Sequence, residues 1–210
     1  VAWIAISFGV VGCRGEGGVR EAGGAGGLWV MSFNLRMNTV TDGLDAWPFR
    51  KEAVVEMMRG VDVIGVQEAL PGMLAEVDQE LEGFGRVGIG REVDGGGEAC
   101  SVYFREGRLE CLESDTFWLS ETPEVAGSMG WDAACPRVAT WARLRERDSG
   151  ARLVVLNVHL DHQGQEARVM SARLLLERME RLAGDDPLLL IGDFNAVESN
   201  DVYRVLTEET

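Results

Sequence analysis

Beyond residue 27 the chain alternates between short hydrophobic runs and longer segments that carry apolar residues on one side only. The short apolar runs predict buried strands at residues 28–33, 61–66 and 188–191. In the longer segments apolar residues recur every three or four positions, which predicts helices at residues 48–59, 71–81 and 165–183. This succession of elements predicts one layered α/β domain.

The middle of the chain has a pattern typical of antiparallel strands. Apolar and polar positions alternate there in short stretches, most clearly from Val138 to Leu144. The strands predicted in this region are residues 101–104, 109–112, 116–119, 138–144 and 152–160. Together with the helices they predict a sandwich of sheets flanked by helices.

The composition is that of an acidic globular protein. The chain has 210 residues, 46% of them hydrophobic, and its 20 Lys and Arg against 35 Asp and Glu give a net charge of −15. This apolar content excludes global disorder. Because duplex binding depends largely on Lys and Arg that neutralise phosphates, the acidic balance argues against tight coating of DNA. Any phosphorylated substrate is therefore expected to be small or bridged by a metal ion.

The N-terminal segment predicts export. Residues 1–13 form an apolar run too short to span a bilayer, and its end, Val10-Val11-Gly12-Cys13, resembles a bacterial lipobox. Residues 14–27 are rich in glycine and are interpreted as a flexible tether. We therefore expect a signal peptide, a lipid on Cys13 and a location in the bacterial cell envelope, or secretion. The alternative is that residues 1–13 form a buried first strand.

The remaining cysteines give no zinc-site pattern. Cys100, Cys111 and Cys135 contain no C-x-x-C pair. Cys100 and Cys111 flank a predicted hairpin turn at Glu106-Gly107, and an exported protein could join them in a disulfide. Sequence alone leaves this pairing open, because it does not show whether the two side chains face each other.

Polar residues follow four of the predicted strands where these strands end. They are Asn34, Gln67, Glu68, Asn157, His159, Asp161, His162, Asp193 and Asn195. Each of these residues taken alone is explained by a turn or a helix entry. Four polar groups at the ends of otherwise apolar strands predict an active site.

These strand ends resemble the motifs of the endonuclease/exonuclease/phosphatase superfamily, which includes DNase I-like nucleases and inositol polyphosphate phosphatases. Asn34 lies in MSFNLR, Glu68 in VIGVQE, His159 and Asp161 in NVHLDH, and Asp193 in LLLIGDFN. The resemblance covers residues 28–210 and includes segments typical of a bacterial, often exported, subgroup. It implies a DNase I-like four-layer α/β sandwich, in which two mainly antiparallel sheets are packed together and flanked by helices.

The resemblance also implies a phosphoesterase that depends on Mg²⁺ or Mn²⁺ and acts through an activated water. Glu68 matches the direct metal ligand, and the amide of Asn34 would support the ion or the phosphate. These oxygen donors suit a hard divalent cation. The expected substrates are a phosphorylated small molecule, a lipid headgroup, a nucleotide or a nucleic acid, and the protein is expected to be a monomer.

The same resemblance assigns roles on the substrate side. Asp193 would orient or deprotonate the attacking water, and Asn195 would hold the scissile group. His159 would hydrogen-bond the phosphoryl oxygens, where negative charge develops in the transition state. Arg137 and Asp161 are expected beside the phosphate, although a solvated arginine at a strand start is the alternative interpretation of Arg137.

The chain departs from the family pattern at its C-terminal end. The family continues after GDFN with further strands and a closing Asp-His pair, whereas this chain stops at Thr210 after a short predicted helix that Ser199 or Asn200 could cap. We therefore expect that residues 28–210 are an incomplete domain, that the last strands are missing, and that the chain as given is weakly active or inactive.

Two alternatives to a phosphoesterase stay open at this point. The segment Asn157 to His162 differs at only one position from the H-x-H-x-D-H signature of metallo-β-lactamase-fold zinc hydrolases, but no further histidines follow it. The second alternative is a non-catalytic surface lipoprotein that keeps the fold and binds a phosphorylated ligand or a partner.

Overall fold

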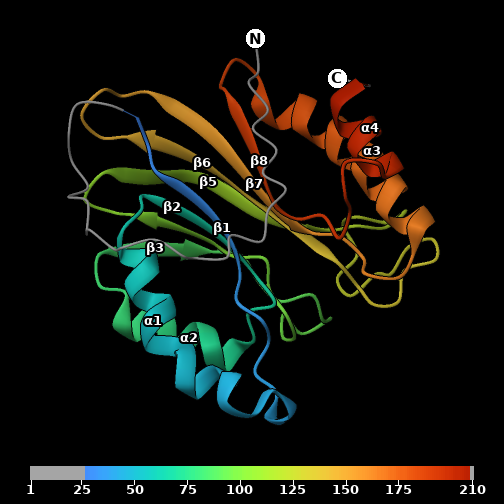
Figure 1. Ribbon diagram of the computed structural model, residues 1–210. Coiled ribbons are helices and arrows are strands. Elements are labelled where there is room, and N and C mark those ends of the chain that lie inside the picture. Colours follow the sequence, from blue (N-terminus) through green and yellow to red (C-terminus); the bar gives the residue numbers. More distant parts are fainter. Residues whose placement is uncertain (1–26, 209–210) are drawn as a thin grey trace.

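The computed structural model describes residues 27–208, in which eight strands form two four-stranded sheets (Figure 1). The strands are β1 (Val30–Asn34), β2 (Val63–Gln67), β3 (Phe84–Val87), β4 (Val102–Arg105), β5 (Leu109–Trp118), β6 (Val138–Glu146), β7 (Arg152–His159) and β8 (Leu188–Asp193). The helices are α1 (Trp47–Arg59), α2 (Pro71–Glu80), α3 (Gln165–Ala183) and α4 (Asp201–Glu208), with a 3-10 turn at Val40–Asp45.

Each half of the chain builds one sheet. The first sheet has the order β1-β2-β4-β3 and the second has the order β5-β6-β7-β8. The pairs β1-β2 and β7-β8 are parallel, and the other pairs are antiparallel. The two sheets are therefore mainly antiparallel, as the sequence predicts, and each of them has one parallel pair that ends in the predicted polar clusters.

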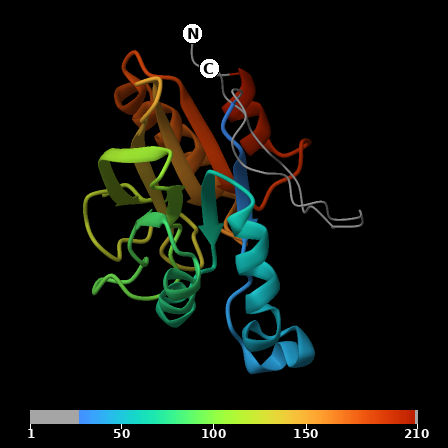
Figure 2. The ribbon, with the colours of Figure 1, turned by 90° about the vertical axis from the view of Figure 1, so that its left-hand side faces the viewer.

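Helices cover the outer faces of both sheets, so the domain has four layers (Figures 1 and 2). Helices α1 and α2 lie on the sheet that contains β3, and helices α3 and α4 lie on the sheet that contains β7 and β8. This arrangement confirms the predicted four-layer α/β sandwich.

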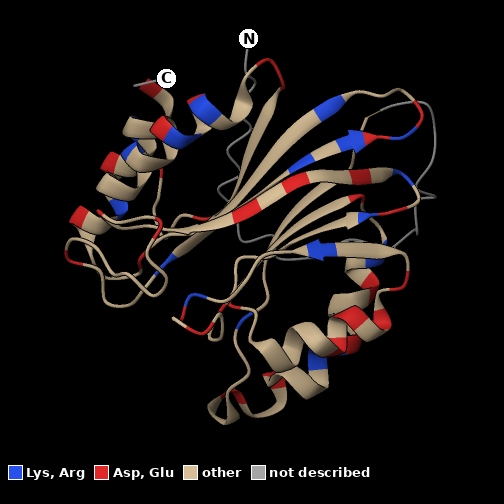
Figure 3. Ribbon diagram, turned by 180° about the vertical axis from the view of Figure 1, so that it is seen from behind, with Lys and Arg blue, Asp and Glu red and all other residues tan. Residues whose placement is uncertain are grey.

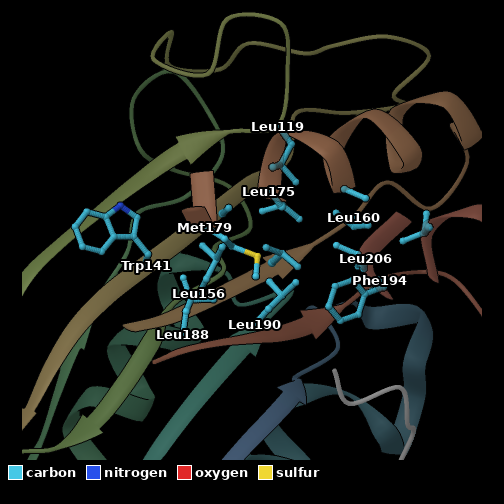
Figure 4. Packing of buried hydrophobic residues seen from close by; sticks show 14 of the residues in the cluster. Leu119, Trp141, Leu156, Leu160, Leu175, Met179, Leu188, Leu190, Phe194 and Leu206 are labelled. Atoms are coloured by element: carbon cyan, nitrogen blue, oxygen red, sulfur yellow. The ribbon is translucent and has the colours of Figure 1, made fainter. Parts of the chain in front are cut away.

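Hydrophobic clusters hold the layers together. Between the two sheets, Val63 and Phe104 of the first pack with Leu144 and Val155 of the second. On the outer face of the second sheet, strand residues pack against α3 and α4 (Figure 4). The residues labelled there are Leu119, Trp141, Leu156, Leu160, Leu175, Met179, Leu188, Leu190, Phe194 and Leu206. Apolar residues on both faces of β7 and β8 explain why these strands read as continuous hydrophobic runs.

The structure corrects two predictions about the middle of the chain. The two strands predicted at residues 109–112 and 116–119 are one strand, β5, which ends at Trp118 and whose pairing with β6 is shifted between Cys111 and Glu113. The extra residue at this β-bulge, Leu112, is 41% exposed, which explains the break in the alternating pattern. The turn at Glu106-Gly107 is not a hairpin, because it connects β4 in one sheet to β5 in the other.

Three cysteines lie in the part of the chain that the structure describes. Cys100, Cys111 and Cys135 are free thiols, so Cys100 and Cys111 form no disulfide in this structure. Cys13, residues 1–13 and all but the last residue of the expected tether lie outside the described residues.

The surface carries charges of both signs. Figure 3 shows Lys and Arg interspersed with Asp and Glu over the helices and the strand ends, without a continuous basic stripe in that view. None of the described helices combines the length and the apolar character needed to cross a membrane.

Candidate active site

The four polar clusters predicted from sequence meet at one edge of the sandwich. Asn34 ends β1 and Glu68 follows β2, while His159 and Asp193 end β7 and β8 as register partners. Because both pairs of strands are parallel, their carboxyl ends point the same way, and the packing of the sheets brings one pair beside the other.

Asn34 joins the carboxylates of the two sheets. Its Nδ2 donates to Glu68 Oε1 and to Asp193 Oδ2, each at 2.9 Å. Its Oδ1 accepts from the backbone N–H of Arg36 at 2.8 Å, which fixes the orientation of the amide. Two negative side chains thus converge on one neutral NH₂ group.

The carboxyl group of Glu68 is held ionised. Burial opposes ionisation, but hydrogen bonds from the Met37 backbone N–H, at 3.0 Å to Oε2, and from Asn34 outweigh it. His159 and Arg36 act in the same direction, and the pKa of Glu68 lies below its ordinary value. Glu68 is therefore an anion at neutral pH, as a ligand for a divalent cation must be.

His159, Asp193 and Asn195 form a connected group. Asn195 Nδ2 lies 3.0 Å from His159 Nε2 and also donates to the Leu160 carbonyl at 3.0 Å, so the amide nitrogen faces the ring and Nε2 accepts. His159 Nε2 lies 3.9 Å from Asp193 Oδ2. The backbone N–H of Asn195 donates to Asp193 Oδ1 at 3.0 Å, which fixes the carboxylate next to the ring.

The imidazole of His159 is neutral at pH 7. Burial and the nearby Arg137 guanidinium lower the pKa of His159 to about 4, although Asp193 and Glu68 act in the opposite direction. A neutral ring keeps one donor and one acceptor, so its hydrogen bond with Asn195 decides which nitrogen carries the proton.

Strained backbone accompanies this group. Among the described residues, the non-glycine residues with positive φ are Arg36, Glu68, Trp131 and Asn195. Glu68 has φ 58° and Asn195 has φ 45°, a region that side-chain-bearing residues rarely adopt. Such strain is typical of functional sites, because the surrounding structure must hold it in place.

Arg137 and Asp161 lie together, with Arg137 toward the site. Asp161 Oδ1 accepts from the backbone N–H groups of Gln163 and Gly164, at 2.9 and 2.7 Å. Its Oδ2 accepts from the Ala134 N–H at 3.2 Å and from Arg137 Nε at 3.4 Å. Asp161 is 1% exposed and all these contacts are internal, so it supports Arg137 and the loop after β7.

Cys135, Asp161 and His162 also offer ligand atoms within 4.8 Å of one another. The Arg137 guanidinium already occupies this group, since Nη2 lies 2.8 Å from His162 Nδ1 and Nε contacts Asp161. A cation placed there would meet that fixed positive charge. The oxygen atoms around Asn34 are therefore the better candidate for a metal site.

An open, shallow hollow lies beside the strand-end residues. Glu68, His159 and Arg137 line it together with Arg91 and Glu98. Sequence analysis did not single out Arg91 and Glu98, which lie in a glycine-rich segment between β3 and β4. The high glycine content of this segment was the sequence signal that could have indicated a loop with a defined conformation.

Two members of the polar clusters are part of the buried core. Gln67 and Asn157 are buried between the sheets, where Gln67 Nε2 donates to Asn157 Oδ1 at 2.7 Å. Asn157 Nδ2 donates to the carbonyls of Val66 and Ser101, each at 2.9 Å. These residues join the sheets beneath the site.

The family was then identified by comparison with known proteins. The sequence profile described as "Endonuclease/Exonuclease/phosphatase family" matches residues 31–210. The chain belongs to this family. The match and the sheet topology overturn the metallo-β-lactamase alternative.

Solved bacterial structures share the fold at appreciable identity. An endonuclease/exonuclease/phosphatase from Bacteroides vulgatus is 35% identical, with a TM-score of 0.83 over 86% of this chain and 70% of that chain. A mannosyl-6-phosphatase from Bacteroides thetaiotaomicron is 34% identical, with a TM-score of 0.84 over 87% of this chain and 71% of that chain.

A curated relative is Nocturnin of Drosophila melanogaster, 33% identical over 119 residues. This match covers 55% of the chain but only 17% of Nocturnin, so the chain spans a small part of that relative. The family comprises nucleases and phosphatases, and its members support a hydrolase.

Proposed function

We propose that this protein hydrolyses a phosphoester with the help of a divalent metal ion and an activated water. The observation that carries the proposal is the pair of carboxylates, Glu68 and Asp193, that share the amide of Asn34. A hollow lined by His159 and Arg137 lies beside them, where a phosphate could bind. The mannosyl-6-phosphatase with 34% identity supports a phosphorylated substrate.

The residues present fit Mg²⁺ or Mn²⁺. Glu68 and Asp193 offer carboxylate oxygens, and no sulfur or imidazole ligand is needed. Two converging carboxylates with one neutral donor between them repel each other, and a cation relieves that repulsion. Glu68 would hold the ion, while Asn34 would support it by fixing both carboxylates. When bound, the cation supplies positive charge that polarises the phosphoryl group.

The protein's own residues would carry the proton transfer. Asp193 accepts a proton from the attacking water, whose oxygen forms a new bond to phosphorus as the ester P–O bond breaks. The leaving oxygen takes up a proton from solvent. The N–H of Asn195 keeps Asp193 in place for this role. The side chains of Asn195 and His159 would hold the reacting phosphoryl group by exchanging the hydrogen bonds that the Asn195 amide donates to His159 and Leu160 for bonds to the phosphoryl oxygens.

Arg137 would bind the phosphate, because it lines the hollow and its charge is fixed. Asp161, which sequence analysis placed beside the phosphate, is proposed instead as a positioning residue. Both of its oxygens are engaged by the loop backbone and by Arg137, so it acts through Arg137.

The proposal includes the location of the protein. We infer an exported lipoprotein with its lipid on Cys13, in which the glycine-rich residues 14–27 hold the domain away from the membrane surface. A monomer is expected, with contact to the membrane through the lipid and not through a spanning helix.

Two measurements on the protein test the function. Phosphomonoesters, phosphodiesters, phospholipid headgroups and nucleotides are assayed with Mg²⁺ or Mn²⁺. Glu68→Gln is expected to lower turnover by about 100-fold or more and to weaken metal binding in calorimetry. The matched control is Glu177→Gln, which changes an exposed carboxylate on α3.

The outcomes separate the alternatives. Binding of a phosphorylated ligand without turnover of any ester would favour the non-catalytic lipoprotein. Unchanged metal affinity in Glu68→Gln would remove Glu68 from the metal site, and tightly held stoichiometric zinc would argue against Mg²⁺ or Mn²⁺.

A further inference from the structure

Arg91 is the second arginine at the hollow, and the proposed reaction assigns it no role. It lies in the segment between β3 and β4, lines the hollow together with Glu68, His159 and Arg137, and has a side chain that is 17% exposed. Its Nη1 donates to Glu98 Oε2 at 3.0 Å. Its buried Nε has no hydrogen-bond partner among the described residues.

The backbone around Arg91 is rigidly held. Its N–H donates to the Glu98 carbonyl at 3.1 Å, and its own carbonyl accepts from Trp118 Nε1 at 2.7 Å. Gly90 is packed so closely that a Cβ there would lie 2.0 Å from the Gly96 carbonyl oxygen. The segment is also tied to the chain after Glu68 by the bridge between Ala69 and Ala99.

This rigidity gives the guanidinium a fixed direction before any ligand arrives. Glu98, 13% exposed, accepts from Nη1, and Glu92 Oε1 lies 3.8 Å from Nε, so two carboxylates orient the guanidinium. The exposed part of the guanidinium lies at the hollow, where it can donate charged hydrogen bonds to a phosphate oxygen.

Two guanidinium groups suit one kind of phosphate. A phosphomonoester has three terminal oxygens and a charge of about −2 at neutral pH. A phosphodiester has two terminal oxygens and a single negative charge, because its third oxygen carries the second ester group. Arg91 adds a second fixed positive charge beside Arg137, and two such charges favour the dianionic monoester over the singly charged diester.

We propose that Arg91, oriented by Glu98, binds a terminal oxygen of a small phosphomonoester and makes this site selective for monoesters over diesters. The inference rests on the proposed function and deepens it, because it names the class of phosphoester. Arg91 is thus a specificity-determining residue of the same site.

The test compares two esters with the same leaving group, para-nitrophenyl phosphate and methyl para-nitrophenyl phosphate. Arg91→Met is expected to lower kcat/KM for the monoester by about 30-fold and for the diester by less than about 3-fold. Arg91→Lys keeps the charge but not the planar fork, and an intermediate loss for the monoester is expected. Equal losses for both esters, or no loss for either, would overturn the proposal.

The matched control is Arg145→Met. Arg145 is a half-exposed arginine at the opposite end of the same strands, since it pairs with Arg152 while His159 ends β7 at the site. The substitution removes the same charge, and kcat/KM for both esters is expected to stay unchanged. Circular dichroism of each variant shows that the fold is kept.

A binding measurement separates this inference from the proposed function. Calorimetry with inorganic phosphate and Mg²⁺ requires no turnover, and Arg91→Met is expected to weaken phosphate binding by about 10-fold. If the wild-type protein hydrolyses neither these two esters nor any other phosphoester of the panel, the proposed function fails, and phosphate affinity still decides the role of Arg91. Equal affinity in wild type and Arg91→Met would overturn that role.

Discussion

Gln67 Nε2 donates to Asn157 Oδ1 across 2.7 Å, and this hydrogen bond joins the two sheets directly beneath the candidate active site. The sheets approach closely here because Gly65 has no side chain. A Cβ at Gly65 would lie 2.6 Å from the side chain of Ile191 and 2.7 Å from Cγ of Asn157. The polar pair thus fixes the separation of the strands that carry the site.

Asn157→Ala is expected to lower the free energy of unfolding by about 3 kcal/mol, because it leaves Gln67 and two backbone carbonyls without their donor or acceptor. Urea unfolding measures the change. The control is Asn38→Ala, an exposed amide outside the sheets, for which a change below about 0.5 kcal/mol is expected. Equal effects of the two substitutions would show that the buried pair does not stabilise the fold.

Asn34→Ala removes the donor shared by Glu68 and Asp193 and lets the two carboxylates separate. The expected result is Mn²⁺ binding that is about 10-fold weaker, because a residue that orients a metal ligand contributes to affinity through that ligand. Calorimetry with Mn²⁺ measures it, with Asn38→Ala again as control. Unchanged affinity would show that Asn34 does not set the geometry of the carboxylates.

The stability of the domain should depend on pH through Asp161. Burial opposes its ionisation, but the N–H groups of Gly164 and Gln163 and the Arg137 guanidinium outweigh burial and lower the pKa of Asp161 to about 2. Because folding lowers the pKa of this acid, Asp161 stabilises the fold at pH values above its ordinary pKa of 3.8. This stabilisation is lost as pH falls toward 2.

Asp161→Asn is therefore expected to unfold more easily than wild type by about 2 kcal/mol at pH 6, with a difference that shrinks as pH falls from 3.8 toward 2. Urea unfolding over that pH range measures the difference. Asp148→Asn, in the exposed turn between β6 and β7, is the matched control. A difference between wild type and Asp161→Asn that stays constant with pH would rule out this linkage.

Cys13→Ser tests the proposed anchor. If Cys13 carries the lipid, wild-type protein made in a bacterial host partitions with membranes, and the substitution abolishes lipid attachment and cleavage before that residue. Mass spectrometry of the N-terminal peptide and membrane fractionation measure both effects. Cys135→Ser is the control. Wild-type protein that keeps residues 1–12 and stays in the cytoplasm would refute the anchor.

Strand-end residues were the part of the site most open to prediction from sequence. Apolar runs that stop at Asn34, Glu68 and Asp193 give both the strand and its end, and parallel pairing then places these ends together. The orientation of Asp161 was not open to prediction in the same way. It follows β7 in a loop, where strand alternation no longer decides which way a side chain points.

The position of Arg91 depended on contacts that the local sequence does not encode. The segment between β3 and β4 has neither helical nor strand periodicity, and its shape comes from glycines with positive φ and from Trp118 in the other sheet. Strand β3 was missed for a related reason, since it has only four half-buried residues, including a glycine, and no alternating pattern.

Asn34 and Asp193, which share a hydrogen bond, are 159 residues apart in the chain, and each comes from a sheet built by its own half. A contact of such long range forms only after both halves have folded and docked. A nascent or partly unfolded chain would therefore be inactive, even with most of its helices and strands formed. The hydrolysis rate would then be proportional to the number of fully folded molecules. If the chain were divided between Glu106 and Gly107, a gain of activity would show that the two fragments have associated.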